Sequence, residues 1–170
     1  MQVGYVLTGE RVCIRDSRRA DGAFCAEMWL DAENGRYMSD PEEAYADEEY
    51  RQALRELEDS PDGYYLMIEA GGEPVGSCCA FPDDERKVYD IGYCIHKNHW
   101  RKGYGQEAVR MLVEWLRQQG AERITAEVAM ENAASNALLR TLGCAVTKET
   151  EFKKYGMDVR YKSYIYELIL

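Results

Sequence analysis

The stretch that most restricts the fold runs from Val88 to Ala108, VYDIGYCIHKNHWRKGYGQEA. It joins a strand-like run to a basic loop, and the loop ends in two glycines, Gly103 and Gly105, where a helical pattern begins. The first amides of a helix lack intrahelical acceptors, the helix dipole favours negative charge there, and glycine lets a ligand approach the backbone closely. This order of elements therefore predicts a site for an anion such as a phosphate.

Positive charge gathers in this loop although the chain as a whole is acidic. The 31 Asp and Glu residues exceed the 21 Lys and Arg residues and give a formal net charge of -10. Lys97, Arg101 and Lys102 nevertheless lie in the loop, together with both histidines of the chain, His96 and His99. Such a concentration in an acidic chain favours an anionic ligand at the loop.

Negative charge is concentrated between Asp31 and Asp62, where twelve acidic residues stand against three arginines. A run of this kind is typical of a solvated helix face. Nucleic acids and anionic membranes bind basic surfaces, which a chain of this net charge does not offer broadly. We therefore expect no nucleic-acid or membrane partner, and a cationic partner instead.

The glycines also match a second nucleotide-binding pattern. Residues 103–108, GYGQEA, fit the dinucleotide fingerprint Gly-x-Gly-x-x-Gly/Ala, which leaves a nicotinamide-binding protein open as an alternative. A doubly wound dinucleotide fold would place several more parallel strand–helix units after the glycines, whereas only one helix–strand–helix passage follows. A Walker phosphate loop is excluded because no Gly-Lys-Ser/Thr closes the loop.

Apolar spacing predicts a meander of strands before the glycines and a mixture of helices and strands after them. The expected strands span 12–16, 64–70, 74–81, 88–95 and 122–130, and two strand-like arms follow residue 145 on either side of a turn at 156–158. The expected helices span 18–33, 41 to about 60, 104–119 and 132–142, with Pro41 in the first turn of the second. With no linker or repeat, the pattern predicts one α+β domain over residues 1–170.

Composition and terminal sequence set further limits. No apolar run approaches the roughly 20 residues that span a bilayer, and the first residues do not follow the pattern of a signal peptide, so we expect a cytoplasmic protein. The six cysteines include no Cys-x-x-Cys pair, and two histidines do not complete a metal site of the usual spacing. We expect reduced, mostly buried cysteines and no metal.

Four short motifs follow one another along the chain: DIGY at 90–93, WRKGYG at 100–105, NAAS at 132–135 and LG at 142–143. Together they resemble the GNAT acyl-CoA N-acyltransferases, and most of all the ribosomal-protein N-terminal acetyltransferase-like branch. In that family the loop reads Gln/Arg-x-x-Gly-x-Gly/Ala, and its amides hold the pyrophosphate of acyl-CoA. The resemblance extends from the strand at 12–15 to the final strand and so covers nearly the whole chain.

For the fold, the resemblance implies a mixed, mostly antiparallel central sheet flanked by helices, with a V-shaped split between the fourth and fifth expected strands, 88–95 and 122–130. Acetyl-CoA would be the co-substrate, without a metal, and its pantetheine arm would lie in the split. The residues that the resemblance assigns to binding it are Cys94, Ile95, His96 and Lys97 near the split, Arg101, Lys102, Gly103, Tyr104, Gly105 and Gln106 in the loop, and Asn132 and Ser135 at the start of the next helix.

Acyl transfer from a thioester needs a neutral amine, an oriented carbonyl and stabilisation of the negative charge that develops on its oxygen. A backbone N–H near Cys94 and Ile95 would polarise the carbonyl, and a carboxylate would take the amine proton. The first candidate base is Asp90, where the similar branch often has Glu, and the second is Glu127. Many family members protonate the leaving thiolate with a tyrosine at the position of Leu139, so the motif assigns no general acid here.

The expected function is therefore transfer of an acetyl group from acetyl-CoA to a primary amine by direct attack in a ternary complex. In the family the early helices wall the acceptor side, and here they carry the acidic concentration. A cationic acceptor is expected: the α-amino terminus of a basic protein, a polyamine or an amino sugar. A non-catalytic acyl-CoA-binding module is the main alternative, and the oligomeric state, including a homodimer, stays open.

Overall fold

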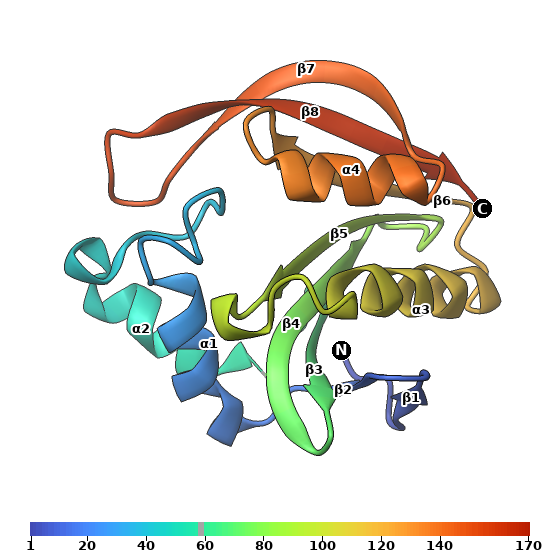
Figure 1. The fold of residues 1–170 in the computed structure, drawn as a ribbon, viewed down its shortest axis with the longest axis horizontal. Helices are drawn as coiled ribbons and strands as arrows, with labels where there is room; N and C mark the ends of the chain where they lie inside the picture. The colour runs from blue at the N-terminus through green and yellow to red at the C-terminus, as the bar shows by residue number, and fades with distance from the viewer. Residues whose placement is uncertain (58–59) are drawn as a thin grey trace.

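One sheet organises the computed structural model, which describes residues 1–57 and 60–170. Its strand order is β1-β2-β3-β4-β5-β6-β8-β7 (Figure 1). The strands are β1 Leu7–Thr8, β2 Cys13–Asp16, β3 Tyr64–Ala70, β4 Glu73–Pro82, β5 Val88–Ile95, β6 Arg123–Ala129, β7 Ala145–Lys153 and β8 Arg160–Ile169. Neighbouring strands are antiparallel except β5 and β6, which are parallel. The expected mixed, mostly antiparallel sheet is confirmed, and a sheet with one parallel pair excludes the doubly wound fold of the nicotinamide-binding alternative.

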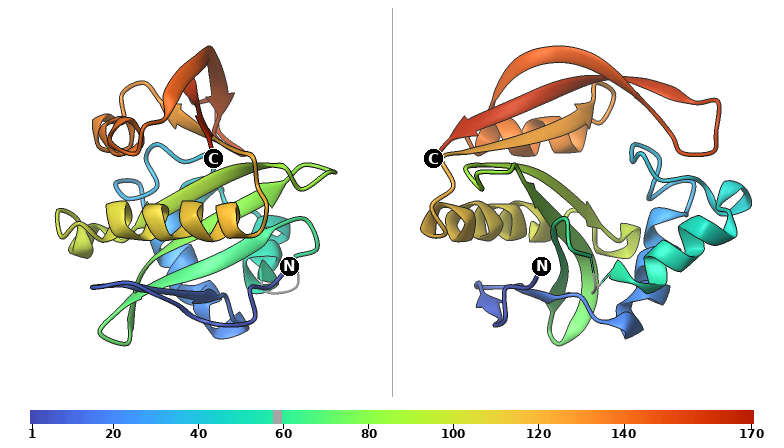
Figure 2. Two further views of the ribbon diagram at one scale, coloured as in Figure 1. Left: turned by 90° about the vertical axis from the view of Figure 1, so that its right-hand side faces the viewer. Right: turned by 180° about the vertical axis from the view of Figure 1, so that it is seen from behind.

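The helices lie on both faces of this sheet. They are α1 Gly22–Trp29, α2 Glu48–Arg55, α3 Tyr104–Gln118 and α4 Ala133–Thr141, with short 3-10 turns at Arg19–Asp21, Glu43–Tyr45 and Lys97–His99. Figure 2 shows α3 and α4 on one side of the sheet. None of the helices in the described chain is long and apolar enough to cross a membrane.

Strand alternation divides the core between the two faces. On β3, Leu66 and Ile68 pack into the larger cluster beneath α3 and α4, while Met67 between them packs with α1 and α2 in the smaller one. Cys94 of β5 belongs to the smaller cluster and Ile91 to the larger. A side chain on β5 therefore points to one helix layer or the other according to whether its number is odd or even.

Two of the expected helices are shorter than the sequence indicated. The helix expected over 18–33 is α1, which ends at Trp29. The helix expected from Pro41 begins only at Glu48, because Asp47 accepts from the N–H of Tyr50 over 2.8 Å and caps it. The expected last residues of that helix, 58 and 59, lie outside the described residues.

The split in the sheet lies between β5 and β6. The two strands pair only where Val88, Tyr89 and Asp90 meet Arg123, Ile124 and Thr125, and they separate beyond that point. The short strand β1 was not expected from the sequence, so the expected fourth and fifth strands are the fifth and sixth of the sheet. Figure 1 shows the separation, with α3 on the β5 side and α4 on the β6 side.

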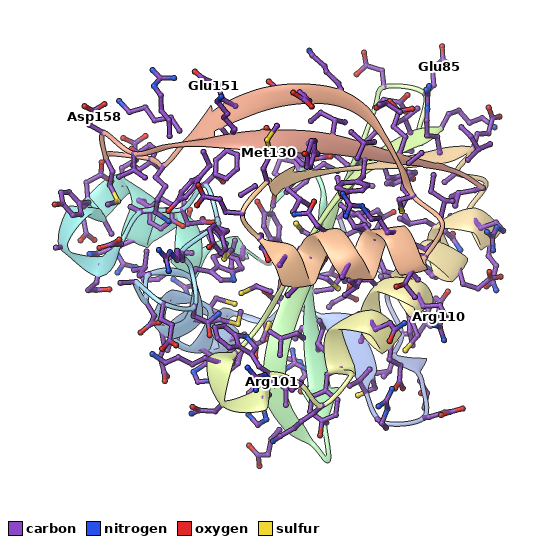
Figure 3. All side chains as sticks on the ribbon, turned by 45° about the horizontal axis from the view of Figure 1, so that its top comes forward. Glu85, Arg101, Arg110, Met130, Glu151 and Asp158 are labelled. Atoms are coloured by element: carbon purple, nitrogen blue, oxygen red, sulfur yellow. The ribbon has the colours of Figure 1, made fainter. Side chains whose placement is uncertain are left out.

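The hairpin of β7 and β8 reaches across to the segment between α1 and α2. The ammonium of Lys154, a fully buried side chain, donates to the carbonyls of Gly35 and Met38 over 2.8 and 3.1 Å. The N–H of Tyr155 donates to the carbonyl of Ser39 over 2.7 Å. Figure 3 shows Asp158 at the tip of this hairpin, beside the early helices. These bonds join the two halves of the molecule at the far end of the split.

Candidate active site

A cleft of about 1050 Å³ opens along the split between β5 and β6. Its walls also include the segment between α1 and α2, the loop before α3, one side of α4, and single residues or short runs of α1, β3, β4 and β7. Because β5 and β6 are not joined there, the cleft connects the two faces of the sheet. A molecule lying in it could therefore meet a second molecule that arrives from the opposite face.

The loop before α3 has the anion-binding geometry that its glycines predict. Arg101 and Gly103 adopt left-handed backbone conformations, with φ of 60° and 77°, and such turns direct successive N–H groups to one side. The helix begins at Tyr104, so its first amides lack intrahelical acceptors. Arg101, labelled in Figure 3, lines the cleft beside these amides.

Arg11 holds this loop from outside the cleft. Its guanidinium donates to the carbonyl of Lys102 over 3.1 Å and pairs with Glu107 over 2.7 Å. The loop needs glycine at position 103 because of its positive φ of 77°, and a Cβ there would displace the Arg11 guanidinium, whose Nη1 would lie 2.5 Å away.

Backbone groups of β5 face the split where β6 no longer pairs with them. The N–H of His96 donates to the carbonyl of Val75 in β4 over 2.9 Å, and the direction of the N–H groups alternates along a strand. The N–H groups of Tyr93 and Ile95 consequently face the split, whereas that of Cys94 faces β4. Of the two donors that the sequence suggested, only the Ile95 N–H is directed into the cleft.

Asn34 connects the segment after α1 to the end of β5. Its Nδ2 donates to the carbonyl of Ile95 over 3.2 Å, and its Oδ1 accepts from the N–H of Lys97. The same Ile95 carbonyl accepts from Nε1 of Trp100 over 2.7 Å. These backbone groups of Ile95 and Lys97 therefore already have protein partners.

Most of the residues that the sequence assigned to cofactor binding line the cleft: Cys94, Ile95, Arg101, Gly103, Tyr104, Gly105, Gln106, Asn132 and Ser135. His96, Lys97 and Lys102 do not. The ammonium of Lys97 lies 2.7 Å from Asp31 and 3.6 Å from Glu33, and the hydrogen bond to Asp31 raises the pKa of Lys97. Its charge is thus compensated within the protein instead of being directed into the cleft.

Both candidate bases line the cleft on the face of α1 and α2. Oδ1 of Asp90 accepts from Oγ1 of Thr125 over 2.8 Å, and Glu127 accepts from Oγ of Ser163 over 2.5 Å. The surrounding protein raises the pKa of Asp90, the Thr125 hydrogen bond opposes this rise, and the negative charge of Glu127 adds to it. A raised pKa brings the Asp90 carboxyl closer to the range in which it exchanges protons at neutral pH.

Asp40 is a cleft carboxylate that sequence reasoning did not single out. The hydroxyl of Tyr50 donates to it, and burial raises its pKa while that hydrogen bond opposes the rise. Aromatic side chains stand near it in the cleft wall: Trp29 and the edge-to-face pair of Tyr65 and Phe81, whose ring centres are 5.4 Å apart. The acidic run pointed to this segment, but only the fold shows that, of its described carboxylates, Glu33 and Asp40 line the cleft.

Tyr93 is a second residue that the sequence did not single out for its side chain. Its hydroxyl is buried and, among the described residues, it is the one buried side-chain polar atom without a hydrogen-bond partner. It lines the cleft on the α4 side with Ser135, whose N–H is bonded to the capping Oδ1 of Asn132 over 3.2 Å. No sequence signal marks an unpartnered hydroxyl, because it depends on how strands and helices meet.

Comparison of the sequence with known protein families shows which family this chain belongs to. Residues 11–145 match the family described as "Acetyltransferase (GNAT) domain", which is most of the chain. The chain belongs to the GNAT acetyltransferase family. As a GNAT N-acetyltransferase it uses acetyl-CoA as the acetyl donor. It is 29% identical over 145 residues to the uncharacterized N-acetyltransferase p20 of Bacillus licheniformis, an alignment that covers 80% of each chain.

Solved structures share the fold of this GNAT acetyltransferase. A GNAT-family acetyltransferase from Bacillus anthracis superposes with a TM-score of 0.80 at 19% identity, covering 97% of this chain and 98% of the other. RimL, a ribosomal L7/L12 α-N-protein acetyltransferase in complex with coenzyme A, superposes with a TM-score of 0.79 at 15% identity, covering 98% of both chains.

The GNAT cleft fits acetyl-CoA on two observations. The glycine loop offers unpaired amides and the Arg101 charge to a diphosphate, and the split offers the backbone N–H groups of Tyr93 and Ile95 to the amide-containing arm. Among the described residues, no group of three His, Cys, Asp or Glu side chains is arranged to hold a metal ion.

Proposed function

We propose that this enzyme acetylates the primary amine of a cationic acceptor by direct attack in a ternary complex. The observation that carries the proposal is the division of charge in the cleft. The anion-binding loop with Arg101 forms one end, whereas four carboxylates line the rest: Glu33, Asp40, Asp90 and Glu127. An anionic cofactor and a cationic acceptor would each find the opposite charge in the same cleft.

The acceptor side combines negative charge with aromatic surface. Trp29, Tyr65 and Phe81 stand in the wall that also contains Asp40, and Nε1 of Trp29 is already bonded to Oγ of Ser77 over 3.1 Å. Aromatic faces attract ammonium groups, and a carboxylate beside them strengthens the attraction. A protein α-amino group, as the name of the similar RimL describes, a polyamine and an amino sugar all have this chemistry.

In this proposal, binding the cofactor, polarising the carbonyl and removing the proton are carried out by different groups of the chain. The loop amides and Arg101 hold the diphosphate, and the Ile95 N–H polarises the acetyl carbonyl. Asp90 takes the proton of the amine, directly or through one water, and Glu127 raises the proton affinity of Asp90. Bound acetyl-CoA supplies the activated acetyl group as a thioester.

A charge-graded panel of amines tests the acceptor class. Thiol release from acetyl-CoA is measured with a polyamine, an amino sugar, a peptide with a basic N-terminal sequence, and a matched peptide with an acidic one. We expect turnover with at least one cationic amine, and a higher KM for that amine in Asp40→Asn than in wild type. Glu149→Gln, which changes an exposed carboxylate of β7 outside the cleft, should leave this KM unchanged.

Two outcomes would count against the cationic acceptor. Faster turnover of the acidic peptide than of the basic one would reverse the charge preference. An unchanged KM in Asp40→Asn would remove Asp40 from acceptor binding even if a cationic amine is the substrate.

A further inference from the structure

The open edge of β5 is bounded at both ends. At its beginning, residues 88–90 pair with β6. At its end, the side chain of Asn34 bonds the backbone: Nδ2 donates to the Ile95 carbonyl over 3.2 Å, and Oδ1 accepts from the Lys97 N–H. The stretch between these two partners is the part of β5 that faces the split without a partner strand.

The Asn34 amide reproduces one residue of a parallel strand. A side-chain amide carries the same donor and acceptor as a peptide group. In a parallel ladder, a residue donates to the carbonyl just before the residue opposite it and accepts from the N–H just after that residue. Asn34 makes these two bonds around His96, and β5 and β6 are parallel. The side chain therefore occupies the place that a continuation of β6 would take.

The segment that carries Asn34 holds it in this position. The N–H of Asn34 donates to Oδ1 of Asp31 over 2.7 Å, and Oδ2 of Asp31 accepts from the Lys97 ammonium over 2.7 Å. A Cβ on Gly35 would lie 2.0 Å from the Trp29 carbonyl oxygen, so the chain takes this path only with glycine after Asn34. Asn34 is itself buried. Its amide therefore has little freedom to leave β5.

The Asn34 bonds determine which backbone donors of the edge remain for acetyl-CoA. The N–H groups of Tyr93, Ile95 and Lys97 all point to the side of the split, because the direction alternates along the strand. The Lys97 N–H is taken by Asn34. Toward the glycine loop, the Ile95 N–H is consequently the last donor of β5 that is left for a ligand.

The difference between Ile95 and Lys97 matters because the acetyl group must also be within reach of Asp90. In the proposed function, the Ile95 N–H polarises the acetyl carbonyl. Lys97 stands two residues further from Asp90, which corresponds to about 6.6 Å along an extended chain. A carbonyl bonded to the Lys97 N–H would lie that much further from the base, and such a complex would be unproductive.

Resting on the proposed function for the place of the reacting group, we propose that Asn34 is a positioning residue whose side-chain amide closes the open edge of β5 and so fixes the register in which acetyl-CoA pairs with that strand. It acts through the backbone of Ile95 and Lys97 and takes no part in the transfer itself. The same segment carries Asp40, so the residue that aligns the donor belongs to the wall with the proposed acceptor carboxylate.

The kinetics of Asn34→Ala test this inference through the relation between kcat and KM. The substitution frees the Lys97 N–H, and position 34 has no positive φ that would resist alanine. We expect kcat to fall about tenfold, the size of one hydrogen bond that favours the unproductive register. The KM for acetyl-CoA should fall with it, because unproductive binding lowers both values and leaves kcat/KM nearly unchanged, whereas a loosened cleft would raise KM.

The carbonyl stretching band of bound acetyl-CoA tests the register without any turnover. Acetyl-CoA with an isotopic label at the acetyl carbonyl is bound to the enzyme without an acceptor and measured by difference infrared spectroscopy. Hydrogen bonds at the carbonyl shift this band, and infrared absorption separates two bound states even when they interconvert rapidly. We expect one band in wild type and two bands in Asn34→Ala.

Two further variants separate the register from other effects. Asn34→Asp keeps an acceptor for the Lys97 N–H and loses only the Nδ2 donor, while the Ile95 carbonyl keeps its bond from Nε1 of Trp100 over 2.7 Å. It should show one band and retain most of the turnover rate. Asn98→Ala is the matched control, since Asn98 is an exposed asparagine that does not line the cleft, and it should behave as wild type.

A raised KM for acetyl-CoA in Asn34→Ala with an unchanged kcat would overturn this inference, as would a single carbonyl band identical to that of wild type. A second band in Asn34→Asp would also contradict it, because the Lys97 N–H keeps its partner there. If wild type acetylates no cationic amine, the proposed function fails, but the infrared comparison needs no acceptor and still tests the register.

Discussion

At the level of single residues, the hydrogen bond from Thr125 is one of three influences on the pKa of the candidate base Asp90. Desolvation by the surrounding protein raises the pKa of Asp90, as does the charge of Glu127, whereas this bond lowers it. A base acts only when ionised, so the rate should increase with pH as Asp90 loses its proton. Thr125→Val removes the donor that favours the charged form, and we expect the rising limb of the pH–rate profile to move to higher pH.

Asp90→Asn complements this test. Removal of the base should lower kcat about 100-fold or more and abolish the rising limb that Thr125→Val only displaces. Thr125→Ser, which keeps the hydroxyl, is the control and should follow the wild-type profile. A Thr125→Val profile identical to wild type would show that Asp90 is not the group that titrates.

Sequence reasoning found residues whose role depends on local chemistry and missed those whose role depends on distant contacts. Gly103 and Arg101 could be found because a glycine loop at a helix start is a local pattern, and both line the cleft. Lys97 belongs to the same basic run, yet its ammonium is bonded to Asp31, 66 positions away. Asp40 and Tyr93 enter the cleft only because separate elements meet there.

At the level of elements, Lys154 joins the hairpin of β7 and β8 to the segment after α1. Lys154→Met should destabilise the protein by about 1–3 kcal/mol, because the carbonyls of Gly35 and Met38 lose their buried donor. The same segment carries Asp40, so the KM for the acceptor amine should rise while the Kd of acetyl-CoA changes little. Chemical denaturation and steady-state kinetics measure the two effects.

Lys148→Met is the matched control for this element, since Lys148 is an exposed lysine of β7 in the same hairpin. It should alter neither stability nor KM. A Lys154→Met enzyme with wild-type KM would mean that the hairpin does not position the acceptor side.

The elements that were predicted well are those with strong local periodicity. The helix expected over 104–119 is α3, and the meander of β3, β4 and β5 follows the expected strands because short polar or glycine-containing turns separate them. Gly71 and Gly72, with φ of 63° and 86°, form the first of these turns. The helix predicted to begin at Pro41 was wrong over the residues before Glu48, because distant contacts fix their path. The N–H of Glu43 donates to the carbonyl of Leu30 and the hydroxyl of Tyr155 donates to Asp47, and no short-range pattern encodes these bonds.

At the level of the whole molecule, ion pairs of Arg15 join β2 and β3 of the sheet to the 3-10 turn before α1. The Arg15 guanidinium bonds both oxygens of Asp21, over 2.6 and 2.9 Å, and Glu69 over 2.6 Å. Burial would raise the pKa of Asp21, but the hydrogen bonds from Arg15 and the Arg18 N–H outweigh it and hold the pKa below its usual value. Asp21 therefore stabilises the fold above the ordinary aspartate pKa of about 3.9, and this stabilisation is lost as pH falls through the lowered value.

Asp21→Asn should lower the free energy of unfolding at pH 7 by about 1.5–3 kcal/mol and make its decline toward acid pH less steep. Denaturant unfolding at a series of pH values measures both quantities. Asp84→Asn, at an exposed carboxylate of the loop between β4 and β5, should follow the wild-type curve. An equally steep decline in Asp21→Asn would place the acid sensitivity elsewhere in the molecule.

The whole cleft acts as one site only if the glycine loop at its end binds the donor. The affinity of acetyl-CoA for wild type and for Gly105→Val, measured by titration calorimetry, tests this most directly. A Cβ on Gly105 would already lie 3.3 Å from Cγ1 of Ile95, and a valine would extend into the space beside the loop amides. Gly120→Ala, at the other end of α3, controls for strain in the helix.

We predict that wild type and Gly120→Ala bind one acetyl-CoA per chain with similar Kd, and that Gly105→Val binds it at least tenfold more weakly. Equal binding by all three proteins, or no binding by wild type, would contradict the assignment of the split and its glycine loop as the acetyl-CoA site.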